Sequence, residues 1–190
     1  MIEELENYAK INHVPIMLPD GINYLTNYIK ENKVKNILEI GTAIGYSSIR
    51  MALIDKDIKI TTIERNHDLY LEAIKNIEKF NLENQIKIIE ADALEIEISG
   101  EFDLIFIDAA KSQYINFFNK FSPLLSKNGT IISDNLSFHG FVNQNEIKSR
   151  NLRQLVRKIN NYIDFLKNHP DFETTFLELG DGLGITKPRD

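Results

Sequence analysis

The fold of this 190-residue chain is decided by the stretch Leu38-Glu39-Ile40-Gly41-Thr42-Ala43-Ile44-Gly45-Tyr46-Ser47. An apolar run over residues 34–40 leads into it and predicts a buried strand, and a helical pattern of apolar residues follows over 46–54. The two glycines carry no Cβ and tolerate positive φ, so the backbone of the turn can approach a ligand closely. Such a stretch is typical of a nucleotide-binding turn between a strand and a helix.

The spacing of these glycines indicates which kind of nucleotide is bound. A dinucleotide fingerprint reads G-x-G-x-x-G, whereas this turn reads E-x-G-x-x-x-G from Glu39 to Gly45. S-adenosylmethionine has no pyrophosphate and needs no middle glycine, which favours it as the ligand. Glu64 ends the next predicted strand, about twenty residues on, where an acidic side chain can accept from two ribose hydroxyls. A glycine turn without a ligand is the alternative.

Strands and helices alternate along the chain after two N-terminal helical segments. The predicted strands are 36–40, 58–63, 86–90, 102–107 and 129–133, and the predicted helices between them are 46–54, 67–80 and 112–121. Asp20 is the expected N-cap of the second N-terminal helix, and Ser149 that of a long C-terminal helix. The final strands, 172–179 and 183–187, are joined by Gly180-Asp181-Gly182, which predicts a tight antiparallel hairpin.

This order of elements predicts an α/β fold. We expect a doubly wound, Rossmann-like, mostly parallel seven-stranded sheet with a C-terminal antiparallel hairpin. The length suits a single domain over 1–190, with N-terminal helices over 1–33 and the Rossmann-like core over 34–190.

Composition excludes several classes of protein. The chain has no cysteine, which excludes disulfides, thiolate metal sites and cysteine nucleophiles. Its 22 Lys+Arg against 28 Asp+Glu disfavour a general nucleic-acid binder. The acidic start lacks a signal-peptide pattern, and no apolar run is long enough to span a bilayer. We therefore expect a cytoplasmic protein that does not enter a membrane.

Oxygen-bearing side chains follow the ends of two neighbouring predicted strands. Asp108 closes strand 102–107, and Asp134 with Asn135 closes strand 129–133. Ligands lie beyond the carboxyl ends of strands in such sheets, so we expect these three side chains to meet there. Hard oxygen donors of this kind suit Mg²⁺, whereas zinc prefers cysteine and histidine. The alternative is that each residue only caps a turn.

Two further residues have expected roles at this edge of the sheet. Lys111, three residues after Asp108, would act as general base on a metal-bound hydroxyl; the alternative is a solvated lysine at a helix start. Asp92 follows the third strand and would accept from the adenine amino group; the alternative is an N-cap.

With these residues placed, the chain resembles the class I, metal-dependent O-methyltransferases of the catechol and caffeoyl-CoA type. The resemblance runs from about Tyr8 to Lys187 and includes Pro15-Ile16-Met17, the glycine turn, the pair Asp108-x-x-Lys111, Asp134-Asn135 and Gly180-Asp181-Gly182-Leu183. More particular strings resemble the bacterial tRNA 5-hydroxyuridine methyltransferases. They are His13-Val14-Pro15-Ile16-Met17, Gly41-Thr42-Ala43-Ile44-Gly45-Tyr46-Ser47, Ile63-Glu64-Arg65-Asn66, Phe106-Ile107-Asp108-Ala109-Ala110-Lys111 and Asn168-His169-Pro170-Asp171.

The resemblance implies a set of site residues and partners. The metal ligands would be Asp108, Asp134 and Asn135, and the catalytic residues Lys111 and Asp108. The residues around the methyl donor would be Met17, Glu39, Gly41, Ala43, Gly45, Ser47, Glu64, Asp92 and Asp108. It also implies a homodimer, and as acceptor the wobble 5-hydroxyuridine of a tRNA anticodon loop, which would become 5-methoxyuridine.

One helix has a basic face that suits a tRNA acceptor. Arg150, Arg153 and Arg157 fall opposite the apolar stripe of the C-terminal helix and could hold anticodon-loop phosphates. A solvated helix face is the alternative. Phe138 and Phe141 could stack on an unstacked base or pack as a lid over the cofactor.

Three other functions compete with this hypothesis. A small-molecule catechol-type O-methyltransferase is favoured by the acidic net charge. A non-catalytic S-adenosylmethionine- or RNA-binding module is disfavoured, because it needs neither Lys111 nor an intact set of metal ligands. A nicotinamide oxidoreductase is disfavoured by the glycine spacing.

Overall fold

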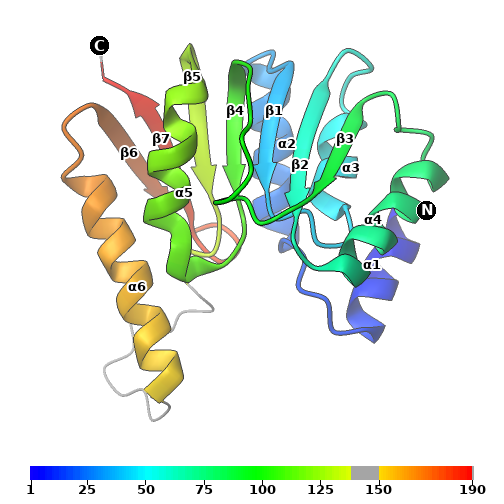
Figure 1. The fold of residues 1–190 in the computed structure, drawn as a ribbon, viewed down its shortest axis with the longest axis horizontal. Helices are drawn as coiled ribbons and strands as arrows, with labels where there is room; N and C mark the ends of the chain where they lie inside the picture. Colours follow the sequence, from blue (N-terminus) through cyan, green and yellow to red (C-terminus); the bar gives the residue numbers. More distant parts are fainter. Residues whose placement is uncertain (138–149, 190) are drawn as a thin grey trace.

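The computed structural model describes residues 1–137 and 150–189, and they form a seven-stranded sheet with helices on both faces (Figure 1). The first half of the chain contains α1 (Ile2–Ile11), α2 (Pro19–Glu31), β1 (Asn36–Ile40), α3 (Tyr46–Ala52), β2 (Lys59–Glu64), α4 (His67–Lys79) and β3 (Ile86–Glu90). The second half contains β4 (Phe102–Ile107), η1 (Lys111–Gln113), α5 (Tyr114–Phe121), η2 (Ser122–Leu124), β5 (Leu125–Ser133), α6 (Arg150–Lys167), β6 (Phe172–Leu177) and β7 (Leu183–Pro188).

The strand order confirms the predicted fold class. The sheet runs β3-β2-β1-β4-β5-β7-β6, with β1 to β5 parallel and β7 antiparallel to both of its neighbours. The chain leaves β1 toward β2 and β3 on one side and later returns to β4 on the other. The strand order therefore reverses at β1 and β4, which is where ligands bind in open α/β sheets.

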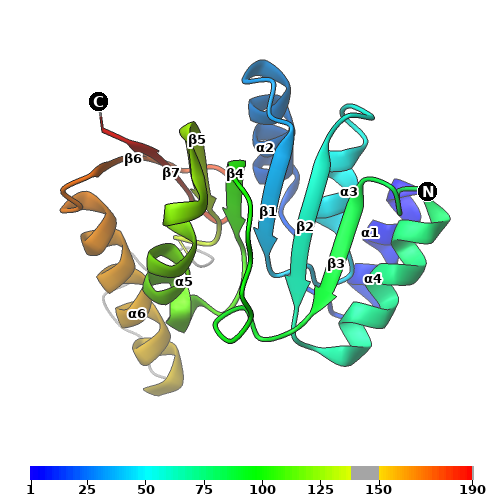
Figure 2. The same cartoon turned by 45° about the horizontal axis from the view of Figure 1, so that its top comes forward.

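The two faces of the sheet bury separate apolar clusters. One cluster joins α1, α2, α3 and α4 to the sheet through fully buried residues such as Ile22, Ile37 and Leu104. The other joins α5 and α6 to the opposite face through Ile105, Phe118 and Tyr162. Figure 2 shows α5 and α6 on the side away from α2 and α3. β1 and β4 are covered on both faces, and eight of their eleven residues are apolar.

Several predicted boundaries need correction. α2 begins at Pro19, not after an Asp20 cap, because proline fits the first helical turn, where no N–H partner is needed. β5 begins at Leu125, four residues before the predicted start, because Leu125 pairs with Phe102 across an irregularity in the register. β6 ends at Leu177, so residues 178–182 form a longer connection to β7 than the tight hairpin predicted.

Some expectations from the sequence stay predictions. Ser149, Phe138 and Phe141 lie outside the described residues. The division at residues 33 and 34 stays a prediction. Within the described ranges, each helix is too short or too polar to serve as a membrane span.

Candidate active site

The glycine turn after β1 packs directly against the end of β4. Gly41 has a φ of 101°, and a Cβ at this position would overlap the carbonyl oxygen of Asp108. Gly45 has a φ of 84° and is the N-cap residue of α3. The N–H of Gly41 donates to the Ile63 carbonyl at 3.0 Å, so the turn is also joined to β2. Both glycines are therefore required by backbone geometry.

The Glu39 side chain stabilises this turn through hydrogen bonds inside the protein. It is fully buried and accepts hydrogen bonds from the hydroxyls of Ser47 (2.5 Å), Ser48 and Thr62 (2.6 Å). Burial raises the pKa of Glu39 to about 7. Glu39 and Gly45 line neither of the two cavities that the described residues form at this edge. These two predicted cofactor-binding residues hold the turn in place.

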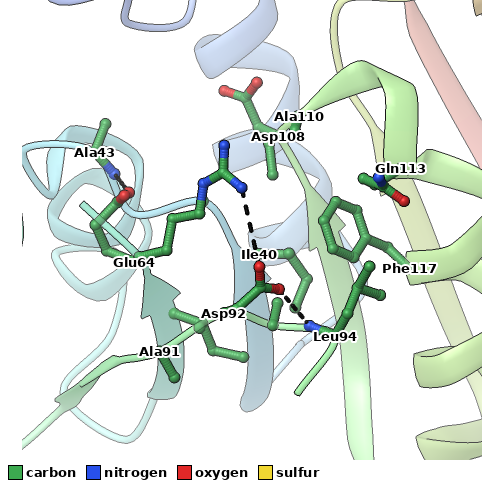
Figure 3. Close-up of a pocket in the computed structure, with 15 residues that line it drawn as sticks. Ile40, Ala43, Glu64, Ala91, Asp92, Leu94, Asp108, Ala110, Gln113 and Phe117 are labelled. Atoms are coloured by element: carbon green, nitrogen blue, oxygen red, sulfur yellow. Dashed lines mark hydrogen bonds and ion pairs between the residues drawn. The ribbon is translucent and has the colours of Figure 1, made fainter. Parts of the chain in front are cut away.

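A first cavity of about 310 Å³ opens beside the turn, at the ends of β1, β2 and β3. Five of the residues predicted to surround the methyl donor line it: Gly41, Ala43, Glu64, Asp92 and Asp108. Glu64 accepts from the backbone N–H of Ala43 at 2.9 Å, and Asp92 from that of Leu94 at 2.9 Å (Figure 3). Both carboxylates are thus fixed by the backbone and keep lone pairs for further donors.

Other residues of this cavity were missed by the sequence analysis. Gln113 and Phe117 line it from η1 and α5, on the side away from Glu64 in Figure 3. Arg65 also lines it and lies 3.9 Å from Asp92, measured from Nη1 to Oδ2. Phe117 belongs to the apolar stripe of α5, so its pattern indicated only a core residue.

A second cavity of about 320 Å³ adjoins the first. Gly41, Ala43, Asp108 and Ala109 line both, so a ligand can extend from one into the other. Of the predicted site residues, this cavity adds Met17, Ser47, Lys111, Asp134 and Asn135. Met17 comes from the loop before α2, and the others follow β1, β4 and β5.

The predicted metal ligands lie together in this second cavity. Asn135 Nδ2 donates to Asp108 Oδ1 at 3.1 Å and to Asp134 Oδ2 at 2.9 Å. Asn135 has a φ of 65°, a left-handed conformation that asparagine tolerates better than most residues. The Tyr114 hydroxyl donates to the Asp134 carbonyl at 3.0 Å and fixes the chain at this point.

Burial makes the charge of these carboxylates costly. It raises the pKa of Asp108, while the neighbouring Lys111 ammonium, 3.8 Å from Asp108 Oδ1, opposes that rise. Burial, and then the charge of Asp108, raises the pKa of Asp134 to about 7. A bound cation would offset both effects.

The chemistry of these donors fits a hard divalent cation. Two carboxylates and one carboxamide, which can turn its oxygen toward an ion, form the all-oxygen set that Mg²⁺ prefers. Within residues 1–137 and 150–189, no three His, Cys, Asp or Glu side chains group as metal ligands. A metal ion held by Asp108 and Asp134 would therefore need the amide oxygen of Asn135 as its third side-chain donor.

The structure also places the predicted tRNA-binding arginines and one acid with no predicted role in the site. Arg150, Arg153 and Arg157 are exposed on α6 and line neither cavity as the described residues define them. Asp181, predicted only as a turn residue, lines the second cavity together with Asp134 and Lys111. The acid between two glycines was the only signal for it, and that signal is typical of many turns.

Comparisons of sequence agree with this geometry. A sequence model of the O-methyltransferase family matches residues 1–188. Caffeoyl-CoA O-methyltransferase 2 of Populus trichocarpa is 30% identical over 181 residues, which cover 88% of this chain and 72% of the relative. Flavonoid 3',5'-methyltransferase of Vitis vinifera is 26% identical over 198 residues, which cover 97% of this chain and 82% of the relative.

Comparisons of structure point the same way. A crystal structure from Staphylococcus aureus, of a candidate caffeoyl-CoA O-methyltransferase, is 44% identical with a TM-score of 0.95, over 99% of this chain and 92% of that one. An O-methyltransferase from Bacillus cereus, in complex with S-adenosylhomocysteine, is 27% identical with a TM-score of 0.84, over 99% of this chain and 90% of that one.

Proposed function

The chain belongs to the O-methyltransferase family, and we propose that it methylates one of two adjacent oxygens on a small molecule, with Mg²⁺ bound beside them. It is an S-adenosylmethionine-dependent O-methyltransferase of the caffeoyl-CoA type. The acceptor and the metal are the parts of this function that we propose.

One observation carries the proposal. The cavity next to the glycine turn adjoins a second cavity, which is lined by acids, an amide and a lysine. The first cavity has the carboxylates that suit ribose and adenine, Glu64 and Asp92. The second has Asp108, Asp134, Asn135 and Lys111. A methyl donor in the first cavity would thus face an acceptor in the second across the shared wall.

Asp108, Asp134 and Asn135 would hold the Mg²⁺. The ion would supply Lewis acidity, which lowers the pKa of a hydroxyl, and positive charge, which favours an acceptor with two adjacent oxygens. A catechol offers such a pair of oxygens. The three side chains thereby orient the acceptor, and a well-oriented reaction avoids much of the entropic cost of bringing two molecules together.

Lys111 would move the proton. Its Nζ, in the neutral form, accepts the proton of the acceptor hydroxyl, and the oxygen's electron pair forms the new bond to the methyl carbon. The carbon–sulfur bond breaks and its electrons remain on sulfur, so the cationic sulfonium becomes a neutral thioether. General-base catalysis of this kind contributes about 10²–10⁴-fold to a rate.

The similar proteins favour a small-molecule acceptor. By their names, the Populus relative acts on caffeoyl-CoA and the Vitis relative on a flavonoid. Both are small aromatic compounds. The net charge of −6 is consistent with this choice, because it gives a polyanionic RNA no general attraction.

A tRNA acceptor is the second candidate, and the arginine face of α6 is the observation that favours it. Arg150, Arg153 and Arg157 are all exposed, and α6 packs against η1, which carries Lys111. Phosphates held on this face would lie near the rim of the second cavity. The 5-hydroxyl and O4 of a 5-hydroxyuracil ring are two adjacent oxygens, as in a catechol.

The test is methyl transfer from labelled S-adenosylmethionine to 3,4-dihydroxybenzoate, caffeate and tRNA that contains 5-hydroxyuridine. Each acceptor is assayed with Mg²⁺ and with EDTA. We expect Mg²⁺-dependent labelling of the catechols. Labelling of tRNA alone would replace the small-molecule acceptor with the tRNA one, and labelling that persists in EDTA would remove the metal from the mechanism.

A further inference from the structure

We propose that Asp181 decides which of the acceptor's two oxygens is methylated, by accepting a hydrogen bond from the hydroxyl that keeps its proton. This inference rests on the proposed function, since it assumes an acceptor with two adjacent oxygens in the second cavity. Asp181 is then a specificity-determining residue of that reaction.

Asp181 lies in the connection between β6 and β7 and lines the second cavity. It stands between Gly180 and Gly182, so it is the only one of these three residues with a side chain. In the sheet, β5 lies between β4 and β7. Lys111 follows β4 and Asp181 precedes β7, so Asp134 and Asn135, at the end of β5, come between them in the order of strand ends.

The backbone holds this connection firmly. The Asp181 carbonyl accepts from the Ser137 N–H at 2.7 Å, and the Gly182 carbonyl accepts from the Leu136 N–H at 3.0 Å. Gly182 has a φ of 87°, and a Cβ there would overlap Ser137. These contacts tie the connection to the segment that follows Asn135. The Asp181 carboxylate therefore keeps its place relative to the predicted metal ligands.

The negative charge of Asp181 interacts electrostatically with both Asp108 and Asp134. The carboxylate of Asp181 is among the causes that raise the pKa values of Asp108 and Asp134. Among the described residues, three carboxylates and one lysine line this cavity, and they give a net charge of −2 when all are ionised, the charge that one Mg²⁺ would balance. Asp181 thus belongs to the same electrostatic unit as the residues that would bind the ion.

Lys111 and Asp181, on either side of the predicted metal ligands, would each bind a different one of the two acceptor oxygens. An ionised carboxylate only accepts hydrogen bonds, so it attracts a hydroxyl and repels an oxyanion. The Lys111 ammonium, formed when the lysine takes up the proton, only donates hydrogen bonds and so stabilises an oxyanion more than a hydroxyl. The oxygen that loses its proton and attacks the methyl group would lie toward Lys111, and the protonated hydroxyl toward Asp181. A catechol with two different hydroxyls would therefore bind mainly in one orientation.

The experiment uses Asp181→Asn, Asp181→Leu and a matched control, Glu178→Gln. Glu178 is exposed, lies in the same connection and lines neither cavity as described. The probe for binding is 4-nitrocatechol, whose visible absorption changes with ionisation, titrated at saturating Mg²⁺ and S-adenosylhomocysteine. The probe for orientation is the ratio of the two monomethyl products of 3,4-dihydroxybenzoate.

We expect Asp181→Asn to weaken 4-nitrocatechol binding about tenfold, the loss typical of a hydrogen bond to a charged group. Asp181→Leu should weaken it further. In both variants the two monomethyl products should approach equal amounts, while S-adenosylhomocysteine affinity and thermal unfolding stay as in wild type. Glu178→Gln should match wild type throughout, because Glu178 is exposed and lines neither cavity as described. A merely structural effect of the Asp181 substitutions on the connection would leave the product ratio unchanged.

Other results would overturn the inference. If wild-type protein binds 4-nitrocatechol and Asp181→Asn binds it equally well with an unchanged product ratio, the role of Asp181 is wrong and the proposed function stands. An equal product mixture from the wild type would also contradict it. If wild-type protein does not bind 4-nitrocatechol, the small-molecule function fails first, and this inference fails with it.

Discussion

The two cavities of the active site differ in how the chain builds them. The first is built largely by short sequence segments, each of which directly follows its own strand, and its acids are fixed by nearby backbone N–H groups. The second gathers residues from the loop before α2, the glycine turn, the ends of β4 and β5, and the connection between β6 and β7. Both cavities therefore exist only in the folded sheet, but the second also draws on residues near the two ends of the chain, Pro15 to Leu18 and Asp181.

The charges of the cavities differ in the same way. In the first, the Arg65 guanidinium lies 3.9 Å from Asp92, and backbone N–H groups donate to the carboxylates of Glu64 and Asp92. In the second, the acids outnumber the lysines among the described residues, and burial raises the pKa values of Asp108 and Asp134. We infer that the first cavity is shaped for recognition and the second for chemistry. Substitutions should then separate binding of the methyl donor from turnover.

The largest effect should come from Asp134→Ala. Loss of a predicted metal ligand should lower kcat by about a thousandfold, since a Lewis acid supplies several kcal/mol of transition-state stabilisation. Binding of S-adenosylhomocysteine should be nearly unchanged, because Asp134 does not line the first cavity. Turnover assays and calorimetry measure the two quantities. A large loss of cofactor affinity would show that the two cavities do not act separately.

Glu39→Gln should change the pH dependence of stability. The pKa of Glu39 is about 7 in the fold against an ordinary 4.5, so the folded state binds the proton more tightly than the unfolded chain. The stability that this provides is present below pH 4.5 and is lost as the pH rises to about 7, a change of up to about 3 kcal/mol. Urea unfolding at a series of pH values measures it.

The glutamine variant should lack this loss. The free energy of unfolding of wild type minus variant should fall between pH 4.5 and 7 and then level off. Glu78→Gln, on the exposed side of α4, is the control. A difference that does not vary with pH would mean that Glu39 does not take up its proton in this range.

Lys111→Met should lower kcat by about 10²-fold, within the usual range for a lost general base. The remaining activity should rise with pH, because solvent bases then remove the hydroxyl proton. Binding of S-adenosylhomocysteine should change little, since Lys111 lines only the second cavity. An unaltered pH–rate profile would assign the proton to another base.

The smallest effect should come from Glu64→Gln, which belongs to the first cavity. Affinity for S-adenosylhomocysteine should fall about tenfold, because one charge-assisted hydrogen-bond acceptor is lost. At saturating S-adenosylmethionine, kcat should stay close to that of wild type. Titration calorimetry and initial rates test this, and a fall in kcat without a change in affinity would reverse the roles of the two cavities.

The fold could be predicted where an apolar run along the chain has a clear end in the sequence. β1, β3 and β4 have the predicted bounds, because their apolar runs end at Gly, acidic or polar residues. The start of β5 could not be predicted. Its first residues, including Ser126 and Asn128, are polar, and they join the strand through its pairing with β4.

The site could be predicted only in part, for a similar reason. Asp108 and Asp134 end neighbouring parallel strands, so the rule for such sheets brings them together from sequence alone. Asp181 approaches from an antiparallel connection, to which that rule does not apply. Glu39 is the opposite case. Its place in a ligand-binding motif indicated contact with the methyl donor, but its buried carboxylate accepts hydrogen bonds from three hydroxyl groups beneath the turn.

The wall shared by the two cavities has a thermodynamic consequence. Gly41 and Asp108 line both, and the Gly41 backbone leaves no room for a Cβ against the Asp108 carbonyl. A ligand that shifts this wall from one side changes the fit on the other. Any factor by which the donor alters affinity for the acceptor must equal the factor by which the acceptor alters affinity for the donor. We expect the contact between Gly41 and Asp108 to transmit this coupling.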